Sequence, residues 1–192
     1  MKSSNRTRYL ILGLLNESPL SGYEIKKIVD MRFSYFWSES YGQIYPELNR
    51  MCNEGLIKKV IDEDDSAPRN RCKYEITTKG GQALKEWLLS PVEKEMIRYE
   101  LLLKLYFSNQ ESADAMIAHI EEFQRSHKQQ QEMFALFQKD LEAHMDLHDN
   151  HPEILMVLLF GQKVWAAYDE WCNEVLVLLN KRKEVEHNDT NK

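Results

Sequence analysis

Polar and aromatic side chains gather between residues 37 and 56, in the stretch WSESYGQIYPELNRMCNEGL, and they are the groups in this chain best suited to binding another molecule. The first half of the stretch offers hydroxyl and amide groups that can hydrogen-bond to bases or phosphates: Ser38, Ser40, Tyr41, Gln43 and Tyr45. Apolar residues behind them recur at steps of three and four: Ile44, Leu48, Met51 and Cys52. This spacing predicts a helix with one buried face and a polar N-terminal end, which is how a DNA recognition helix is built.

Two residues determine where this helix is expected to begin and end. Gly55 tolerates the left-handed backbone that closes many helices, so the helix should end at Glu54. Pro46 lacks an N–H group, and deep in a helix its ring would clash with the carbonyl four residues earlier. We therefore expect the regular helix to begin between Gly42 and Tyr45, after an irregular turn. A helix kinked at Pro46 is the alternative.

Two short runs after this helix have the composition of a β-hairpin. Residues 56–61 (LIKKVI) and 72–77 (CKYEIT) are strand-like, and the polar residues between them contain a proline. Arg69, Arg71 and Lys73 are spaced two apart, so on an extended chain their side chains point the same way. Such a row of cations suits the phosphates beside a DNA groove. The alternative is an ordinary solvated loop.

Three more helices are expected to surround the recognition helix and the hairpin. Residues 8–16 are apolar and helical in pattern, and Ser21 with Glu24 has the spacing of a capping box that begins a second helix. A threonine at 77 or 78 begins a fourth helix that runs to Leu89. This order of elements predicts a winged helix-turn-helix.

The dipeptide Ser90-Pro91 is the best domain boundary, because everything after it has a helical pattern. We expect a DNA-binding domain at residues 1–90, a helical dimerisation domain at 91–186 and a disordered tail at 187–192. The helices expected in the second domain cover residues 93–107, 108–147 and 153–183. The predicted fold class is therefore mainly α with a small β-hairpin: an N-terminal winged helix-turn-helix followed by an all-α dimerisation domain.

Apolar residues on the long helix of the second domain alternate at steps of three and four, which is the signature of a coiled-coil seam. We predict that this seam and the last helix form a homodimer through Ile120, Phe123, Phe134, Phe137, Leu141, Trp165 and Leu179. An antiparallel pairing of the two helices within one chain is the alternative, and it is compatible with a dimer.

Charge and composition limit the kind of protein without identifying it. The chain has 192 residues and a net charge of −6, and its longest uninterrupted apolar run is too short to cross a membrane. Residues 1–80 carry 13 basic against 11 acidic side chains, whereas residues 81–192 carry 12 against 20. A local basic face is therefore possible in the first part only. Three scattered cysteines indicate a reduced, cytoplasmic protein.

Other chemistries have weaker support in the sequence. His144, His148 and His151 lie near one another, but Pro152 interrupts them and we predict no metal site and no cofactor. No nucleophile elbow, phosphate loop or zinc-protease motif is present, so we expect no enzyme. Four aromatic residues are candidates for stacking on a small aromatic effector, although most aromatic residues at helical spacing belong to the core: Trp87, Trp165, Tyr168 and Trp171.

The motifs YLILGLL, SPLSGYEIKK and WSESYGQIYPELNRMCNEGLI together resemble the PadR family of bacterial transcriptional regulators over residues 8–80. The helical remainder is similar to the C-terminal domain of AphA-like two-domain regulators. This resemblance implies a homodimeric repressor that binds a palindromic operator in double-stranded DNA, often released by a small aromatic molecule. The alternative function is a winged-helix module that binds another protein without specific DNA binding.

The resemblance and the pattern of residues together select the expected DNA contacts. The recognition helix supplies polar side chains at its start and a cation near its end, the second helix supplies its first turn, and the wing supplies its basic row. These residues are Ser21, Tyr23, Ser40, Tyr41, Gln43, Tyr45, Arg50, Arg69, Arg71 and Lys73.

Overall fold

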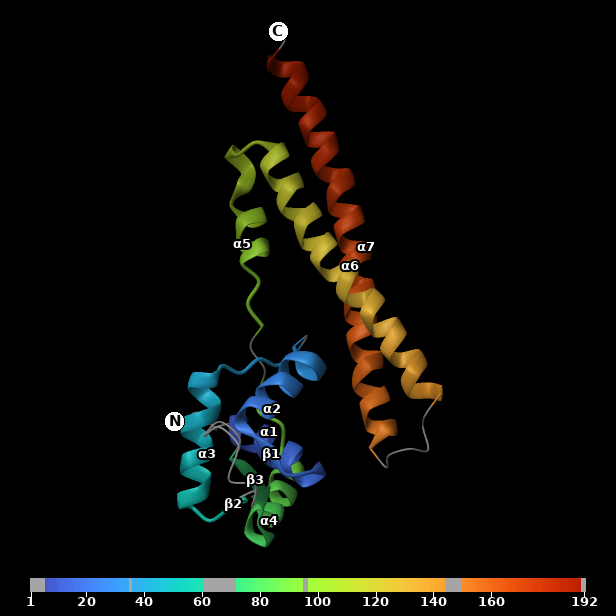
Figure 1. Cartoon of the computed structure of the whole chain (residues 1–192). Helices are drawn as coiled ribbons and strands as arrows, with labels where there is room; N and C mark the ends of the chain where they lie inside the picture. The colour runs from blue at the N-terminus through green and yellow to red at the C-terminus, as the bar shows by residue number, and fades with distance from the viewer. Residues whose placement is uncertain (1–5, 35, 61–71, 95–96, 144–149, 191–192) are drawn as a thin grey trace. The chain divides into compact units, whose positions relative to one another are not determined.

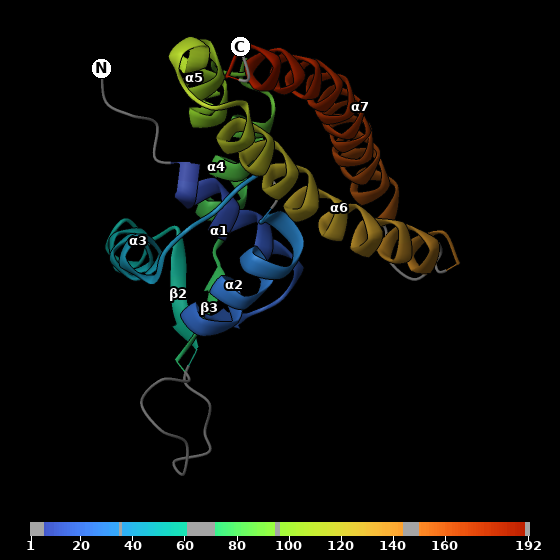
Figure 2. The ribbon, with the colours of Figure 1, turned by 90° about the horizontal axis from the view of Figure 1, so that it is seen from above.

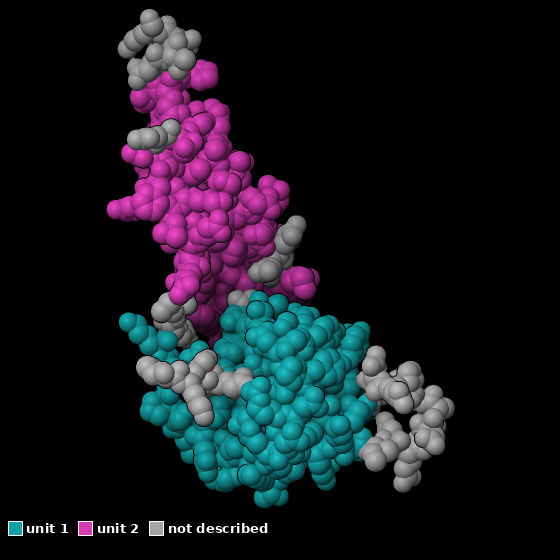
Figure 3. Space-filling view, turned by 90° about the vertical axis from the view of Figure 1, so that its left-hand side faces the viewer, with its two compact units in different colours: residues 1–94 teal, residues 95–192 magenta. Residues whose placement is uncertain are grey.

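The computed structural model describes residues 6–34, 36–60, 72–94, 97–143 and 150–190. The chain forms two compact units, residues 1–94 and 95–192 (Figure 3). The fold class predicted from the sequence is confirmed: the chain is mostly helical, with one small antiparallel sheet in the first unit (Figure 1). Among the residues described, none of the helices is both long and apolar enough to span a membrane.

The first unit contains the elements of a winged helix-turn-helix. In chain order they are α1 (Arg6–Glu17), β1 (Leu20–Ser21), α2 (Gly22–Ile28), the π-helical turn η1 (Val29–Phe33), α3 (Tyr41–Asn53), β2 (Ile57–Val60), β3 (Lys73–Ile76) and α4 (Thr78–Leu88).

The sheet has the strand order β1-β3-β2, and both pairings are antiparallel. Strands β2 and β3 are the two arms of the predicted hairpin, with Lys59 opposite Tyr74. Strand β1 was not expected, because its two residues are too few to show an alternating pattern. Its Leu20 lies opposite Tyr74 on the other side of β3, so β3 is the central strand.

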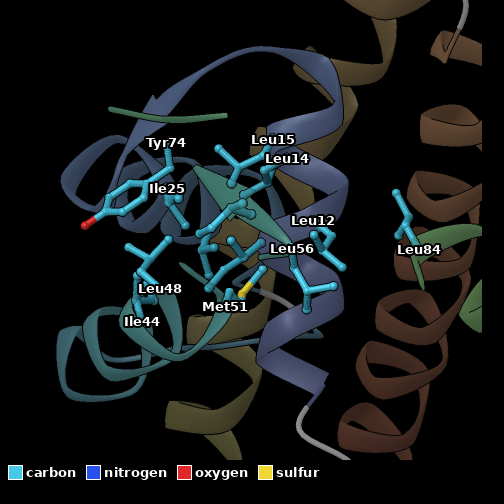
Figure 4. Close-up of a cluster of buried hydrophobic side chains, with 13 residues drawn as sticks. Leu12, Leu14, Leu15, Ile25, Ile44, Leu48, Met51, Leu56, Tyr74 and Leu84 are labelled. Carbon is cyan, nitrogen blue, oxygen red and sulfur yellow. The ribbon is translucent and has the colours of Figure 1, made fainter. Parts of the chain in front are cut away.

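One hydrophobic core holds the first unit together. Figure 4 shows buried side chains of α1, α2 and α3 meeting beside the sheet, with Ile44, Leu48 and Met51 contributed by α3. These three are among the four apolar positions that the sequence pattern predicted for the recognition helix, and each is fully buried. The fourth, Cys52, is half-buried. Burying side chains of this size stabilises a fold by about 1.5–3 kcal/mol each, so the core fixes the orientation of α3.

The end of α3 agrees with the prediction and its start does not. Gly55 has a φ of 71° and follows the C-cap Glu54, as expected. The helix begins at Tyr41, one residue before the expected range, and passes regularly through Pro46. Ser40 and Gln43 hold the first turn together by a side-chain pair, which gives the helix a stable start upstream of the proline.

The second unit consists of α5 (Glu100–Tyr106), the short 3-10 turn η3 (Ser108–Gln110), α6 (Ala113–Ala143) and α7 (His151–Thr190). A helix was expected from residue 93, but α5 begins seven residues later. Its N-cap, Tyr99, has an extended backbone, and the Tyr99 hydroxyl hydrogen-bonds to that of Tyr168 on α7. Residues 91–94 and 97–99 lie outside any helix, so the expected helix is shorter at its start.

Helix α7 continues well past residue 183, where the sequence predicted its end. It runs to Thr190 and so includes residues 187–190 of the predicted disordered tail. Arg182 and Glu186 form an ion pair one turn apart, with 2.7 Å between nitrogen and oxygen. Glu186 also accepts a hydrogen bond from the backbone N–H of Ala113, the first residue of α6. The polar end of α7 thus contacts the first residue of α6.

Helices α6 and α7 pack antiparallel along their length (Figures 1 and 2). The seam predicted for dimerisation is used within the chain. Ile120, Leu141, Trp165 and Leu179 are buried, Phe123 and Phe134 are half-buried, and Phe137 is exposed. The antiparallel pairing within one chain, which was the alternative kept open from the sequence, therefore buries most of this seam. Phe137 stays exposed, and the predicted dimer contacts stay a prediction.

Candidate nucleic-acid interface

The exposed start of α3 is the centre of the candidate interface. The backbone N–H of Ser40 and its hydroxyl both donate to the side-chain oxygen of Gln43, at 2.9 and 2.8 Å. The Gln43 oxygen is thus occupied in capping the helix, while the amide NH2 group carries the two donor hydrogens. The side chain of Gln43 can therefore bind hydrogen-bond acceptors on a ligand more readily than hydrogen-bond donors.

Two tyrosines extend this surface along the first turns of α3. Tyr41 and Tyr45 expose 46% and 39% of their surface and stack on each other, with ring centroids 6.1 Å apart. Lys26 of α2 lies 5.6 Å from the Tyr41 ring centre and also pairs with Asp30. A cation over an aromatic face is attracted by the ring quadrupole. Lys26 is a site residue that sequence reasoning missed, because only the fold brings α2 over Tyr41.

The first turn of α2 fits closely against the same surface. A Cβ atom on Gly22 would lie 2.7 Å from the Tyr45 ring, so a larger residue here would require that ring to move. Tyr23, the next residue, is 57% exposed and available to a ligand. Ser21 is buried, and its hydroxyl donates to Glu24 at 2.8 Å within the predicted capping box. The structure therefore gives Ser21 a capping role and leaves Tyr23 at the surface.

A buried acid precedes the recognition helix, and no sequence motif identified it. Glu39 accepts hydrogen bonds from the hydroxyl of Thr7 at 2.8 Å and from the indole N–H of Trp37 at 2.9 Å, both to the same oxygen. It therefore ties α1 to the segment that leads into α3. The buried second oxygen of this carboxylate has no hydrogen-bond partner among the described residues.

Arg50, near the end of α3, belongs to a network of charges. Its guanidinium lies 2.7 Å from one oxygen of Glu47, whose other oxygen accepts from Arg8 Nε of α1 at 3.0 Å. Arg8 also donates to Glu54 at 2.9 Å. Burial acts to lower the pKa of Arg8, but the hydrogen bonds and charges of Glu47 and Glu54 outweigh it and raise that pKa above its ordinary value.

The wing is described only at its base. Lys73 is half-buried on β3, opposite Val60 on one side and Ser21 on the other. Arg69 and Arg71 lie outside the described residues. The predicted row of three cations therefore stays a prediction.

The aromatic residues predicted to bind an effector lie in different places. Trp87 is in the first unit, stacked on Tyr9 at 4.7 Å. Trp165 stacks on Phe134 at 4.4 Å between α6 and α7. The ring centroids of Tyr168 and Trp171 lie 5.6 and 6.1 Å from that of Phe123, within the range of aromatic pairs.

The hollow beside Trp165 and Tyr168 is shallow. It is lined by Gln124, His127, Lys128, Gln131, Trp165, Tyr168 and Asp169. Trp171 and Trp87 take no part in it, so the four aromatic residues do not line a common hollow in the part of the chain that the structure describes. Across those same residues no cluster of acidic, histidine or cysteine side chains has the arrangement of a metal site, and His144 and His148 fall outside them.

Comparison with known proteins gives the same two-part division. Residues 11–86 match the model of the transcriptional regulator PadR-like family, and residues 97–180 match that of the virulence activator alpha C-terminal domain. The negative transcriptional regulator PadR of Bacillus subtilis is 28% identical over 182 residues, which cover 91% of this chain and 97% of that protein.

Solved structures of this relative and of another regulator superimpose on most of the chain. Bacillus subtilis PadR in complex with operator DNA has a TM-score of 0.75 at 26% identity and covers 90% of this chain and 98% of its own. The same protein with p-coumaric acid has a TM-score of 0.71 at 27% identity and the same coverage. The Vibrio cholerae virulence activator AphA has a TM-score of 0.72 at 26% identity and covers 92% of this chain and 99% of its own.

Two adjoining family models, the matching winged-helix core and the paired C-terminal helices all lead to one assignment. The chain belongs to the PadR-like family of transcriptional regulators, in the two-domain form with an AphA-like C-terminal domain.

Proposed function

We propose that this chain is a homodimeric repressor that binds a palindromic operator through α3 and the wing. The observation that carries the proposal is the exposed start of α3, where Tyr41, Gln43 and Tyr45 present hydrogen-bonding groups above a fully buried core face. The structure of the Bacillus subtilis relative with operator DNA supports it. We assign the protein to the bacterial cytoplasm, as a regulator rather than an enzyme, without a cofactor.

The contacts divide into base reading and backbone binding. Gln43 would donate its amide hydrogens to acceptors in the major groove, such as purine N7. Because its oxygen is held by Ser40, a two-point pairing with adenine would require that oxygen to be shared. Arg69, Arg71 and Lys73 would bind flanking phosphates, which fixes register but reads no sequence.

The second unit would set the distance between two recognition helices. On B-DNA that distance must be about 34–36 Å or a multiple of it for both helices to reach the same face. Exposed apolar side chains on α6 and α7 supply a surface for a partner chain, among them Met133, Leu136, Phe160, Val177 and Leu178.

An effector would act by favouring one spacing over another. The complex of the Bacillus subtilis relative with p-coumaric acid supports a small aromatic effector for this chain also. Trp165 and Tyr168, which line the hollow on α7, are the residues that we propose for it, in preference to Trp87 and Trp171. A ligand changes the equilibrium only if it binds the two states with different affinity.

Anisotropy titrations against DNA upstream of the gene, at two salt concentrations, test the proposal. Phosphate contacts make log K fall with log salt at a slope of about −0.9 per contact, so tight binding should weaken steeply as salt rises. A random-sequence selection supplies an operator if the upstream DNA fails. Absence of any selected sequence would favour the alternative function, a winged-helix module that binds protein.

Two substitutions test the division of contacts. Gln43→Ala should change which sequences are preferred, with a cost of about 1–3 kcal/mol on the best operator. Lys73→Ala should weaken binding to all sequences and reduce the salt slope by about one contact. Equal behaviour of the two variants would contradict this division.

A further inference from the structure

The network around Glu47 contains a buried anion between two arginines. The Glu47 side chain is only 1% exposed, although it is a carboxylate on the helix proposed to bind DNA. Burying an unpaired charge is costly, and this charge is paired on both oxygens. One oxygen binds Arg8, which is three-quarters buried on α1, and the other binds Arg50, whose side chain is 55% exposed.

The spacing of these residues places Arg50 on the side of α3 that carries Gln43. Residues 43, 47, 50 and 54 are separated by four, three and four positions, so they form one stripe along the helix. Gln43 is exposed at the start of the stripe and Arg50 lies about 10 Å farther along the axis, at 1.5 Å per residue. A cation there is suitably placed for a phosphate at the edge of a groove that Gln43 enters.

We infer that Glu47 and Arg8 are positioning residues that hold the Arg50 guanidinium in place for a DNA phosphate. The inference rests on the proposed function. Arg8 neutralises the buried anion from the α1 side, and the anion in turn restricts a long side chain that would otherwise occupy many rotamers. Ordering such a side chain in advance removes a cost that binding would otherwise carry.

The sign of one substitution separates positioning from simple electrostatics. Glu47→Gln removes a negative charge from the DNA-binding helix, so charge alone would tighten binding. If Glu47 positions Arg50, the same substitution should weaken operator binding about two- to tenfold. Glu54→Gln is the matched control, because Glu54 is the C-cap residue of α3, also binds Arg8 and carries the same charge. It should leave affinity unchanged or raise it.

A double-mutant cycle shows whether Glu47 acts through Arg50. Arg50→Ala should weaken binding of the full-length protein to its selected operator, and adding Glu47→Gln should then have no further effect. Additive losses, an Arg50→Ala variant that binds like the wild type, or a folded Glu47→Gln variant that binds as tightly as the wild type would each overturn the inference.

Arg50→Lys keeps the test decisive if Glu47→Gln does not fold. Lysine preserves the charge at an exposed position but lacks the planar, directional guanidinium. An affinity loss close to that of Arg50→Ala supports a positioned arginine, and wild-type affinity overturns it. In both cases the wild-type protein still binds its operator, whereas failure of the proposed function would abolish that binding as well.

Discussion

The contact between Gly80 and the turn after α3 shows how closely one residue can join α4 to the end of the recognition helix. Thr77, the N-cap of α4, donates its hydroxyl to the backbone oxygens of Gly55 and Leu56 at 2.8 and 3.0 Å. A Cβ atom on Gly80 would lie 2.1 Å from the same Leu56 oxygen. This contact is with backbone, which cannot rotate away. The side chain is therefore absent for a steric reason.

Gly80→Ala should lower the free energy of unfolding by about 2–4 kcal/mol, because the start of α4 must move away from β2. Urea denaturation followed by circular dichroism measures this change. Gly81→Ala is the control, since nothing lies within 4 Å of a Cβ atom there. It should leave stability unchanged or raise it by about 0.5–1 kcal/mol. Equal stability of both variants would contradict the contact.

Helices α5 and α7 are connected by a pair of tyrosines. The Tyr99 hydroxyl, just before α5, hydrogen-bonds to the Tyr168 hydroxyl on α7. Burial, and then the hydrogen bond to Tyr99, raise the pKa of Tyr168 from 10 to about 12. The folded protein therefore keeps this proton at a pH where the unfolded chain has lost it.

This pKa shift predicts a loss of stability at high pH. The contribution is fully present below pH 10, the unfolded value, and disappears as pH rises toward 12. Thermal unfolding between pH 9 and 12 should show this loss of stability. It should amount to at most about 1.4 kcal/mol for each unit of the pKa shift. Tyr99→Phe should make that decline smaller. Tyr106→Phe, at a ring on α5 that is 80% exposed, should leave the decline unchanged.

The assembly of two chains is the feature of the whole molecule on which operator binding depends. Most of the predicted seam is buried in the α6–α7 pairing, so we expect a dimer to use exposed apolar side chains, Phe137 among them. Leu178 on α7 is 64% exposed and adjoins exposed Val177. An exposed apolar pair of this kind indicates a surface for association.

Leu178→Glu should halve the mass measured by light scattering at micromolar concentration, because a charge would be buried without a partner. Operator affinity should fall with it, since a monomer engages one half-site and loses the gain from linking two. Asn188→Glu adds the same charge to an exposed position of α7 and should keep the native mass. A dimeric Leu178→Glu variant would place the interface elsewhere.

Local features of this protein could be predicted from the sequence because they depend on neighbours along the chain. The capping box at Ser21, the glycine that ends α3, the buried stripe of Ile44, Leu48 and Met51, and the hairpin all follow from spacing and residue type. The motif resemblance then identified the family, because it extends over several of these elements in order.

Only the tertiary structure decided what distant residues do to one another. It paired Glu47 with Arg8, placed Lys26 over Tyr41 and joined Tyr99 to Tyr168. It also used the predicted dimer seam within one chain and continued α7 to Thr190. Periodicity along a helix reports that a face is buried, but it carries no information on which element covers that face, and that choice is made by packing across the fold.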